Sequence, residues 1–331
     1  MMKPTAQRRL EQAKEVLHTV KYPLLTHYGL QGVGVGLRTV NGEVTDEPVI
    51  KTFVSKKLAP DQVPAGLKIP RRIADSGVDT DVEEIGVITS PPFRTPEVEH
   101  LEARLLKADS KRKRPVTAGS SVSHALGSLG TVTAIVSDNL APSTRAVLSC
   151  NHVLAQLNRG LYGDAVVQPA AGDGGAIPLD VCAALTRYIP IRFGSTLTPN
   201  FVDAAIAHLP PQVELGAVNI AGVSAGSAVQ PGEAIYKIGR TTGLSRGTVV
   251  ATHVSLWINY PPILGGATLG YALFEDQIMT TSIAGFGDSG SLVLDAQKRA
   301  IGMLFGGSAT RTLVNDISHV QKALGVRLLI S

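Results

Sequence analysis

The sequence lacks several features that define protein classes. Its 331 residues include two cysteines, Cys150 and Cys182, which are too few for a disulfide scaffold. The sequence does not show whether these two cysteines form a disulfide bond with each other. It contains no CxxC and no HExxH motif, and a metal site needs more ligands at closer spacing. We therefore expect no metal and no cofactor.

Long hydrophobic runs are also missing. No apolar run approaches the length of a membrane helix, and the first 25 residues have neither the continuous apolar core nor the small-residue cleavage site of a signal peptide. We therefore expect a cytoplasmic protein without a membrane partner. Aromatic residues make up only 5%, whereas 34 glycines and 20 prolines suit a chain with many turns.

A strong excess of charge is absent as well. The formal net charge of +4 does not argue for nucleic acid, which needs a clustered basic face. The one basic run, at 111–114, is best interpreted as a solvated linker, because blocks of like charge are usually disordered. The alternatives are a cleavage site for another peptidase and a contact for acidic surfaces.

The N-terminal part of the chain has mixed patterning. Apolar residues recur at helical spacing over 5–20, which predicts an amphipathic helix. Two β-rich runs then flank Asn41-Gly42, a strong hairpin signal. We expect a small α+β domain over residues 1–90 and a linker rich in proline and charge over 91–118.

The rest of the chain, 119–331, has a different texture. Short β-branched runs are separated by Gly, Pro, Asn and Asp, which predicts a mainly β barrel or sandwich. The amphipathic tail at 312–326 predicts a C-terminal helix.

A serine nucleophile is indicated by the motif Gly287-Asp288-Ser289-Gly290. Such a serine needs an exposed hydroxyl and two backbone N–H groups directed at the developing oxyanion. Glycines beside it let the chain turn so that these groups converge without a Cβ in the way. Taken alone, the motif also fits a tight polar turn between strands.

A general base and its orienting carboxylate are found in two other segments. His152 follows an apolar run and could take the Ser289 proton. Asp203 begins the apolar run at 203–207, and burying a carboxylate is costly unless it is hydrogen-bonded, for which a His Nδ1–H is suitable. Three other aspartates compete for this role from a loop rich in Gly and Pro: Asp164, Asp173 and Asp180. The remaining histidines are interpreted as structural or solvated: His18, His27, His100, His124, His208, His253 and His319.

Taken together, these three segments resemble those of the chymotrypsin-like serine peptidases. The resemblance covers about residues 119–320 and implies two six-stranded antiparallel β-barrels with the site between them. It implies a catalytic triad of His152, Asp203 and Ser289, and an oxyanion hole from the N–H groups of Gly287 and Ser289.

A narrower similarity is to the intracellular bacterial and plant peptidases of the NARROW LEAF 1 type. It rests on the loop at 168–175, the Gly-Arg-Thr-Thr-Gly run at 239–243 with Gly247, and the stretch at 80–86. The resemblance to the plant members implies a homo-oligomer.

The chain also departs from the trypsin pattern. No Ile-Val-Gly-Gly follows a basic residue, so Asp288 needs a partner other than a newly formed N-terminus. Ile283 stands where trypsin-type enzymes place a specificity Asp, which favours an apolar or small substrate side chain. The wall that pairs with the substrate backbone is expected at Phe305, Gly306 and Gly307.

The sequence therefore predicts a serine endopeptidase that acts on a protein or peptide. One alternative is a peptide-binding or scaffold module on a peptidase fold, with little turnover. A second is a peptidase that processes itself near residues 108–118.

Overall fold

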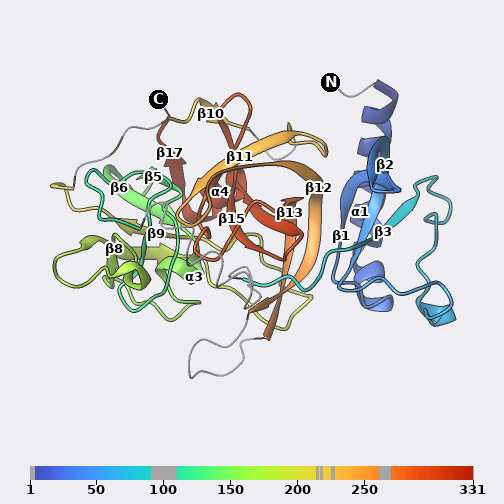
Figure 1. Ribbon diagram of the computed structural model, residues 1–331, viewed down its shortest axis with the longest axis horizontal. Coiled ribbons are helices and arrows are strands. Elements are labelled where there is room, and N and C mark those ends of the chain that lie inside the picture. The colour runs from blue at the N-terminus through green and yellow to red at the C-terminus, as the bar shows by residue number, and fades with distance from the viewer. Residues whose placement is uncertain are drawn as a thin grey trace.

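The computed structural model describes residues 4–90, 110–213, 216, 219–224, 228–260 and 270–330. Within them the chain is mainly β, with two sheets and a few helical segments (Figure 1). The helical segments are α1 (Pro4–His27), η1 (Ala65–Leu67), α3 (Asn151–Leu154), η2 (Ala171–Asp173) and α4 (Ile317–Leu324).

The first sheet has seven strands among the described residues, and all of its neighbouring strands are antiparallel. In spatial order they are β17 (Val326–Leu328), β5 (Ala134–Asp138), β6 (Ala141–Ser149), β9 (Ala205–His208), β8 (Val181–Tyr188), β7 (Ala165–Val167) and β4 (Ser123–His124). It carries the segments of two candidate site residues, because His152 follows β6 and Asp203 precedes β9.

The second sheet has ten strands in the described part of the chain and is mostly antiparallel. In spatial order they are β11 (Ala234–Gly239), β14 (Leu292–Asp295), β15 (Arg299–Gly307), β16 (Arg311–Asp316), β13 (Gly270–Thr281), β12 (Gly243–Tyr260), β1 (Gly32–Val40), β2 (Glu43–Val54) and β3 (Thr80–Glu84), with β10 (Gly222–Val223) beside β15. Because β11 also pairs with β12, the strands from β11 to β12 form a closed ring of pairings. The mainly β class with two antiparallel sheets is confirmed, whereas the two six-stranded barrels stay a prediction.

The N-terminal region is joined to this second sheet. The predicted hairpin at Asn41-Gly42 connects β1 and β2, and β1 pairs with β12. A Cβ at Gly32 would lie 2.6 Å from the Leu256 Cβ, so the close approach of β1 to β12 requires a glycine there. The boundaries at 1–90, 91–118 and 119–331 stay a prediction, and residues 91–109 lie outside the described residues.

Both helix predictions needed adjustment. Helix α1 runs from Pro4 to His27, beyond the expected 5–20, because Leu24 and Leu25 continue its buried face. The expected helix at 312–326 was too long. Its first part is strand β16, which pairs with β13 and β15, and α4 begins only after the side chain of Asp316 caps the Ser318 amide at 2.7 Å.

The core and the cysteines complete the fold. One hydrophobic cluster is shared by both sheets and a second lies under α1. Cys150 and Cys182 are both buried and free, so they do not pair with each other. Among the described residues, no helix has the length and apolar character needed to cross a membrane.

Candidate active site

The site begins with a hydrogen-bonded pair of His152 and Asp203. His152 lies in the short helix α3, directly after β6, and its Nδ1 is 2.7 Å from the Asp203 Oδ2. The backbone N–H of His152 donates to the Asp203 Oδ1 at 3.2 Å. The carboxylate therefore holds both the ring and the backbone of the histidine, which leaves Nε2 directed elsewhere.

Asp203 is fully buried and has further donors around it. The Tyr260 hydroxyl donates to the Asp203 Oδ2 at 3.2 Å. The backbone amide of Asp203 donates to the Asn315 Oδ1 at 2.8 Å. Burial, together with the nearby Asp203 charge, raises the pKa of Tyr260 well above its ordinary value. The phenol consequently keeps its proton and remains a donor, as a buried carboxylate requires.

Ser289 lies in a tight turn just before β14. Gly287 and Gly290 flank it with φ of +96° and +94°, a region that favours glycine. A Cβ at Gly290 would lie 2.1 Å from the Thr131 carbonyl oxygen. Thr131 fixes the turn, because its amide donates to the Ser289 carbonyl and its hydroxyl to the Gly287 carbonyl, each at 2.8 Å.

The serine turn and the histidine segment share two hydrogen-bond partners, Leu304 and Thr131. The Leu304 carbonyl accepts from the Gly290 amide at 2.7 Å and from the Cys150 thiol at 3.3 Å. The Ser149 hydroxyl donates to the Thr131 carbonyl at 2.8 Å. Because Cys150 is two residues before His152, and Gly290 directly follows Ser289, these contacts bring the two segments together.

Two polar atoms at this junction have no hydrogen-bond partner among the described residues. They are the His152 Nε2 and the Ser289 Oγ, and both are buried. Buried polar atoms without partners are rare in folded proteins, and catalysis is one reason for keeping them. The structure thus shows the His152–Asp203 bond and the neighbouring serine turn, while the triad itself stays a prediction.

The amides of Gly287 and Ser289 were predicted to form the oxyanion hole. Within the described ranges, neither N–H donates a hydrogen bond. A free pair of amides in a glycine-flanked turn fits that role. The oxyanion-hole assignment itself stays a prediction.

Asp288 obtains the partner that its sequence context required. The Lys237 Nζ lies 2.9 Å from its Oδ2, and both side chains are fully buried. Its carboxylate also accepts from the amides of Thr241, Thr242 and Gly285. Sequence reasoning missed Lys237, although it shares a face of β11 with the buried Ile235, which is a detectable signal.

The two loops singled out in the sequence meet at an ion pair. Arg240, in the Gly-Arg-Thr-Thr-Gly run, donates through Nε to the Asp173 Oδ2 at 2.8 Å and makes a second, shorter contact with the same carboxylate. The Ser121 hydroxyl donates to Asp173 at 2.5 Å. Asp173 is therefore occupied by Arg240 and Ser121, not by a histidine. The run at 239–243 also contacts the serine turn, because the Thr241 hydroxyl donates to the Phe286 carbonyl at 2.5 Å.

The predicted substrate-binding residues are mostly interior. Ile283 is only 4% exposed and lies in a hydrophobic cluster with Val249 and Ile278. Phe305 is fully buried, with its ring centroid 5.0 Å from that of Phe274. Gly307 is hydrogen-bonded through its backbone to another segment of this chain. Gly306 lies beside the same segment. None of these contacts tests the substrate roles, which stay predictions.

A metal could be considered where Cys150, His152 and Asp203 come together, since their ligand atoms lie within 4.8 Å of one another. Burial and the Asp203 charge raise the pKa of the Cys150 thiol well above its ordinary value. A metal needs the thiolate, and the His152 Nδ1 is already bonded to Asp203. This donor set therefore fits a metal poorly.

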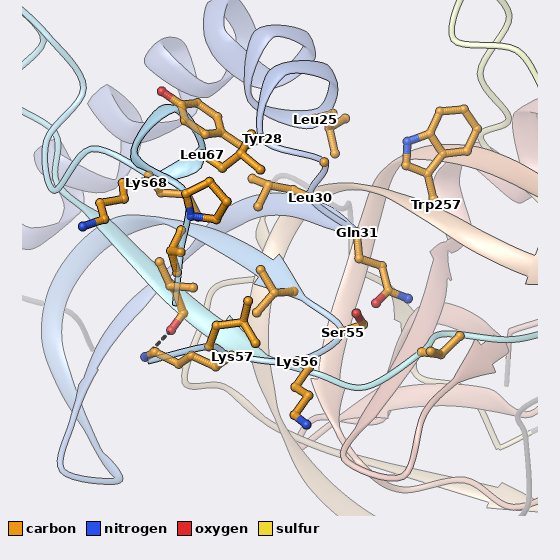
Figure 2. Close-up of a pocket in the computed structure, with 18 of the residues that line it drawn as sticks. Leu25, Tyr28, Leu30, Gln31, Ser55, Lys56, Lys57, Leu67, Lys68 and Trp257 are labelled. Carbon is orange, nitrogen blue, oxygen red and sulfur yellow. Dashed lines mark hydrogen bonds between the residues drawn. The ribbon is translucent and has the colours of Figure 1, made fainter. Parts of the chain in front are cut away.

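A large hollow lies elsewhere, beside the N-terminal region (Figure 2). It has a volume of about 830 Å³ and is lined by α1, the segments after β2 and part of β12. Leu25, Tyr28 and Trp257 give it apolar walls, and Lys56 and Lys68 contribute charged side chains. None of the candidate catalytic residues lines it, so the chemistry described above belongs to a different place.

Comparisons with known proteins gave matches among solved structures alone. No family profile and no curated protein sequence matches this chain. Solved structures of serine proteases are similar to it. Thermobifida fusca protease A is 17% identical, with a TM-score of 0.45, and the match covers 65% of this chain and 99% of that one.

Two further solved structures give comparable values. Cellulomonas bogoriensis chymotrypsin is 22% identical with a TM-score of 0.43, covering 65% of this chain and 99% of its own. Nocardiopsis protease is 18% identical with a TM-score of 0.44, covering 64% and 98%.

Proposed function

We propose that this protein is a serine endopeptidase that hydrolyses peptide bonds with His152, Asp203 and Ser289. The observation that carries the proposal is the 2.7 Å bond between the His152 Nδ1 and Asp203, which leaves Nε2 without a partner next to the turn of Ser289. A base oriented by a carboxylate and placed beside a serine is the arrangement that nucleophilic catalysis needs.

The reaction would proceed in two stages. The His152 Nε2 takes the proton from the Ser289 Oγ as this oxygen attacks the scissile carbonyl carbon, and the amides of Gly287 and Ser289 stabilise the oxyanion. The protonated imidazole gives its proton to the leaving amine as the C–N bond breaks. Nε2 then takes a proton from a water molecule as the water oxygen attacks the acyl carbon, and returns it to the Ser289 Oγ as the ester C–O bond breaks and the carboxylic acid product leaves.

The finer assignments from the sequence are part of this proposal. They are membership of the NARROW LEAF 1-type peptidases, two six-stranded barrels, a cytoplasmic location and a homo-oligomer. A preference for an apolar or small substrate side chain, inferred from Ile283 at the position of the trypsin-type specificity Asp, also belongs to this proposal.

The proposal is tested with a fluorophosphonate probe. The probe should attach covalently to Ser289 in the wild type and leave the Ser289→Ala variant unmodified. A Ser137→Ala variant, changed on β5 of the first sheet, should be modified like the wild type. If the probe does not modify folded wild-type protein, the proposed serine peptidase activity is excluded.

Two alternatives make different predictions. The burial of the Ser289 Oγ without a bond to Nε2 favours a binding module with little turnover, which would bind peptides but resist the probe. Self-processing near 108–118 requires Ser289, so intact mass should show cleavage of the wild type and none of Ser289→Ala. Equal cleavage of both would exclude self-processing.

A further inference from the structure

The end of strand β15 presents the backbone groups that a bound peptide would be expected to use. These groups are the Phe305 carbonyl and the carbonyl and amide of Gly307. All three are already hydrogen-bonded by Thr89 and Ser90, which precede the predicted linker. The Thr89 amide donates to the Gly307 carbonyl, and the Gly307 amide donates to the Thr89 carbonyl, each at 3.0 Å. The Ser90 hydroxyl donates to the Phe305 carbonyl at 2.6 Å.

The same residues are held on their other side by β12. The Ser90 amide donates to the Asn259 carbonyl at 3.1 Å, and the Asn259 amide donates to the Ile88 carbonyl at 3.0 Å. Residues 88–90 therefore form a short strand between β12 and β15, which we name the inserted strand. It is antiparallel to β15, as the paired residues Thr89 and Gly307 show.

The inserted strand is closely packed and ends at the candidate base. Ile88 and Ser90 are fully buried. A Cβ at Gly306 would lie 2.9 Å from the Thr89 carbonyl oxygen, so the strand fits against β15 because position 306 is glycine. The Ser90 hydroxyl lies 3.4 Å from the His152 Nδ1.

An extended peptide that binds at a sheet edge gains affinity from main-chain hydrogen bonds to that edge. One edge cannot pair with two strands at once. We propose that the inserted strand is a built-in inhibitor, so that a peptide substrate reaches Ser289 only by displacing residues 88–90 from β15. This inference rests on the proposed peptidase function and adds its regulation.

Occupation of the edge has a measurable consequence. A ligand that binds only the open form has its apparent affinity reduced by the fraction of molecules that are open. A small reagent that reacts with Ser289 without pairing along β15 does not compete with the inserted strand. A reagent with a peptide arm does compete with the inserted strand. The reaction rates of the two reagents at Ser289 should therefore respond differently to any change in that strand.

The first experiment uses the wild type and two phosphonylating reagents. One is diisopropyl fluorophosphate, and the other is a tetrapeptidyl diphenyl phosphonate with an apolar residue next to phosphorus. Hydrogen exchange of the amides of Thr89, Ser90 and Gly307 is measured before and after each modification. Reaction with the peptidyl reagent should raise the exchange of Thr89 and Ser90, whereas the small reagent should leave it unchanged.

The second experiment changes Thr89 itself. Thr89→Pro removes the N–H that bonds Gly307 and should accelerate modification by the peptidyl reagent by about tenfold or more, with little effect on the small one. Thr89→Val is the matched control. The Thr89 Oγ1 has no partner among the described residues, so valine keeps the backbone pairing and should leave both rates unchanged.

The outcomes separate this inference from the function on which it rests. If Thr89 and Ser90 remain protected while the peptidyl reagent is attached to Ser289, the inserted strand is a permanent part of the fold and the inference is wrong. Equal peptidyl rates for Thr89→Pro and Thr89→Val also overturn it. If neither reagent modifies Ser289 in folded wild type or in Thr89→Pro, it is the peptidase function that fails.

Discussion

Lys237 and Asp288 form an ion pair whose two side chains are both fully buried, with the Lys237 Nζ 2.9 Å from the Asp288 Oδ2. The pair links the middle of β11 to the residue before Ser289. Burial lowers the pKa of Lys237, and the Asp288 charge and hydrogen bond oppose that shift. The pair therefore fixes the serine turn from within the second sheet, without a free N-terminus.

The first prediction concerns this pair. Lys237→Met should destabilise the protein by roughly 3–5 kcal/mol, because it leaves a buried carboxylate without its cation. It should also slow fluorophosphonate modification of the remaining folded protein, because Asp288 adjoins Ser289. Urea unfolding and the modification rate are the measurements.

A second buried lysine provides the control for this prediction. Lys51 is bonded to Asp81 at 2.9 Å and Glu83 at 2.8 Å in the N-terminal region. Lys51→Met should lower the free energy of unfolding as well, but leave the modification rate of folded protein unchanged. Equal rates for the two variants would contradict a role of Lys237 in positioning the turn.

The second prediction concerns the Asp203 carboxylate. Asp203→Asn should lower kcat/KM for peptide hydrolysis by about 10³- to 10⁴-fold, because an amide holds the imidazole in the wrong tautomer. Peptide turnover by purified protein is the measurement. The control is Asp276→Asn, since Asp276 bonds the His253 Nδ1 at 2.7 Å in a more exposed pair away from Ser289. Similar losses in both variants would indicate a general structural effect.

The third prediction uses two glycines with similar backbone angles. Gly290 has φ of +94° and no room for a Cβ, whereas Gly163 has φ of +90° and nothing within 4 Å of that position. Gly163→Ala should cost about 1–2 kcal/mol of unfolding free energy from backbone strain alone. Gly290→Ala should cost more and abolish modification of Ser289, because the turn must move away from Thr131. Comparable stability of the two variants in urea would refute the steric argument.

The fourth prediction is a pH dependence. Burial alone would raise the pKa of Asp138, but hydrogen bonds from Arg187 and His208, each 2.8 Å, and from the Leu140 amide hold it below its ordinary value. A carboxyl with a lowered folded-state pKa stabilises the protein above the unfolded pKa of about 4, and this stabilisation is lost as the pH falls further.

The matching experiment compares wild type with Asp138→Asn. The wild type should have the larger free energy of unfolding at pH 5, and the difference should shrink as the pH is lowered below about 4. Urea titrations at several pH values measure it. A difference that is the same at pH 5 and at the lowest pH would show that Asp138 does not contribute through its charge.

Local patterns in the sequence determined the elements that depend on neighbouring residues. Asn41-Gly42 can adopt positive φ at low cost, so its hairpin was predictable. The short β-branched runs separated by Gly, Pro, Asn and Asp predicted a mainly β chain, and the motif around Ser289 indicated a glycine-flanked turn. The pairing of His152 with Asp203 was also anticipated, because a buried carboxylate has few suitable partners.

Contacts between distant segments were decided only by the tertiary structure. The Lys237–Asp288 pair and the Tyr260 hydroxyl on Asp203 join residues that no local pattern relates. Helix α4 begins late because the residues before it are paired with strands on both sides, and pairing overrides local helical periodicity. The insertion of residues 88–90 beside Gly307 is likewise a property of the fold, because its main-chain hydrogen bonds join backbone groups that every residue type except proline carries.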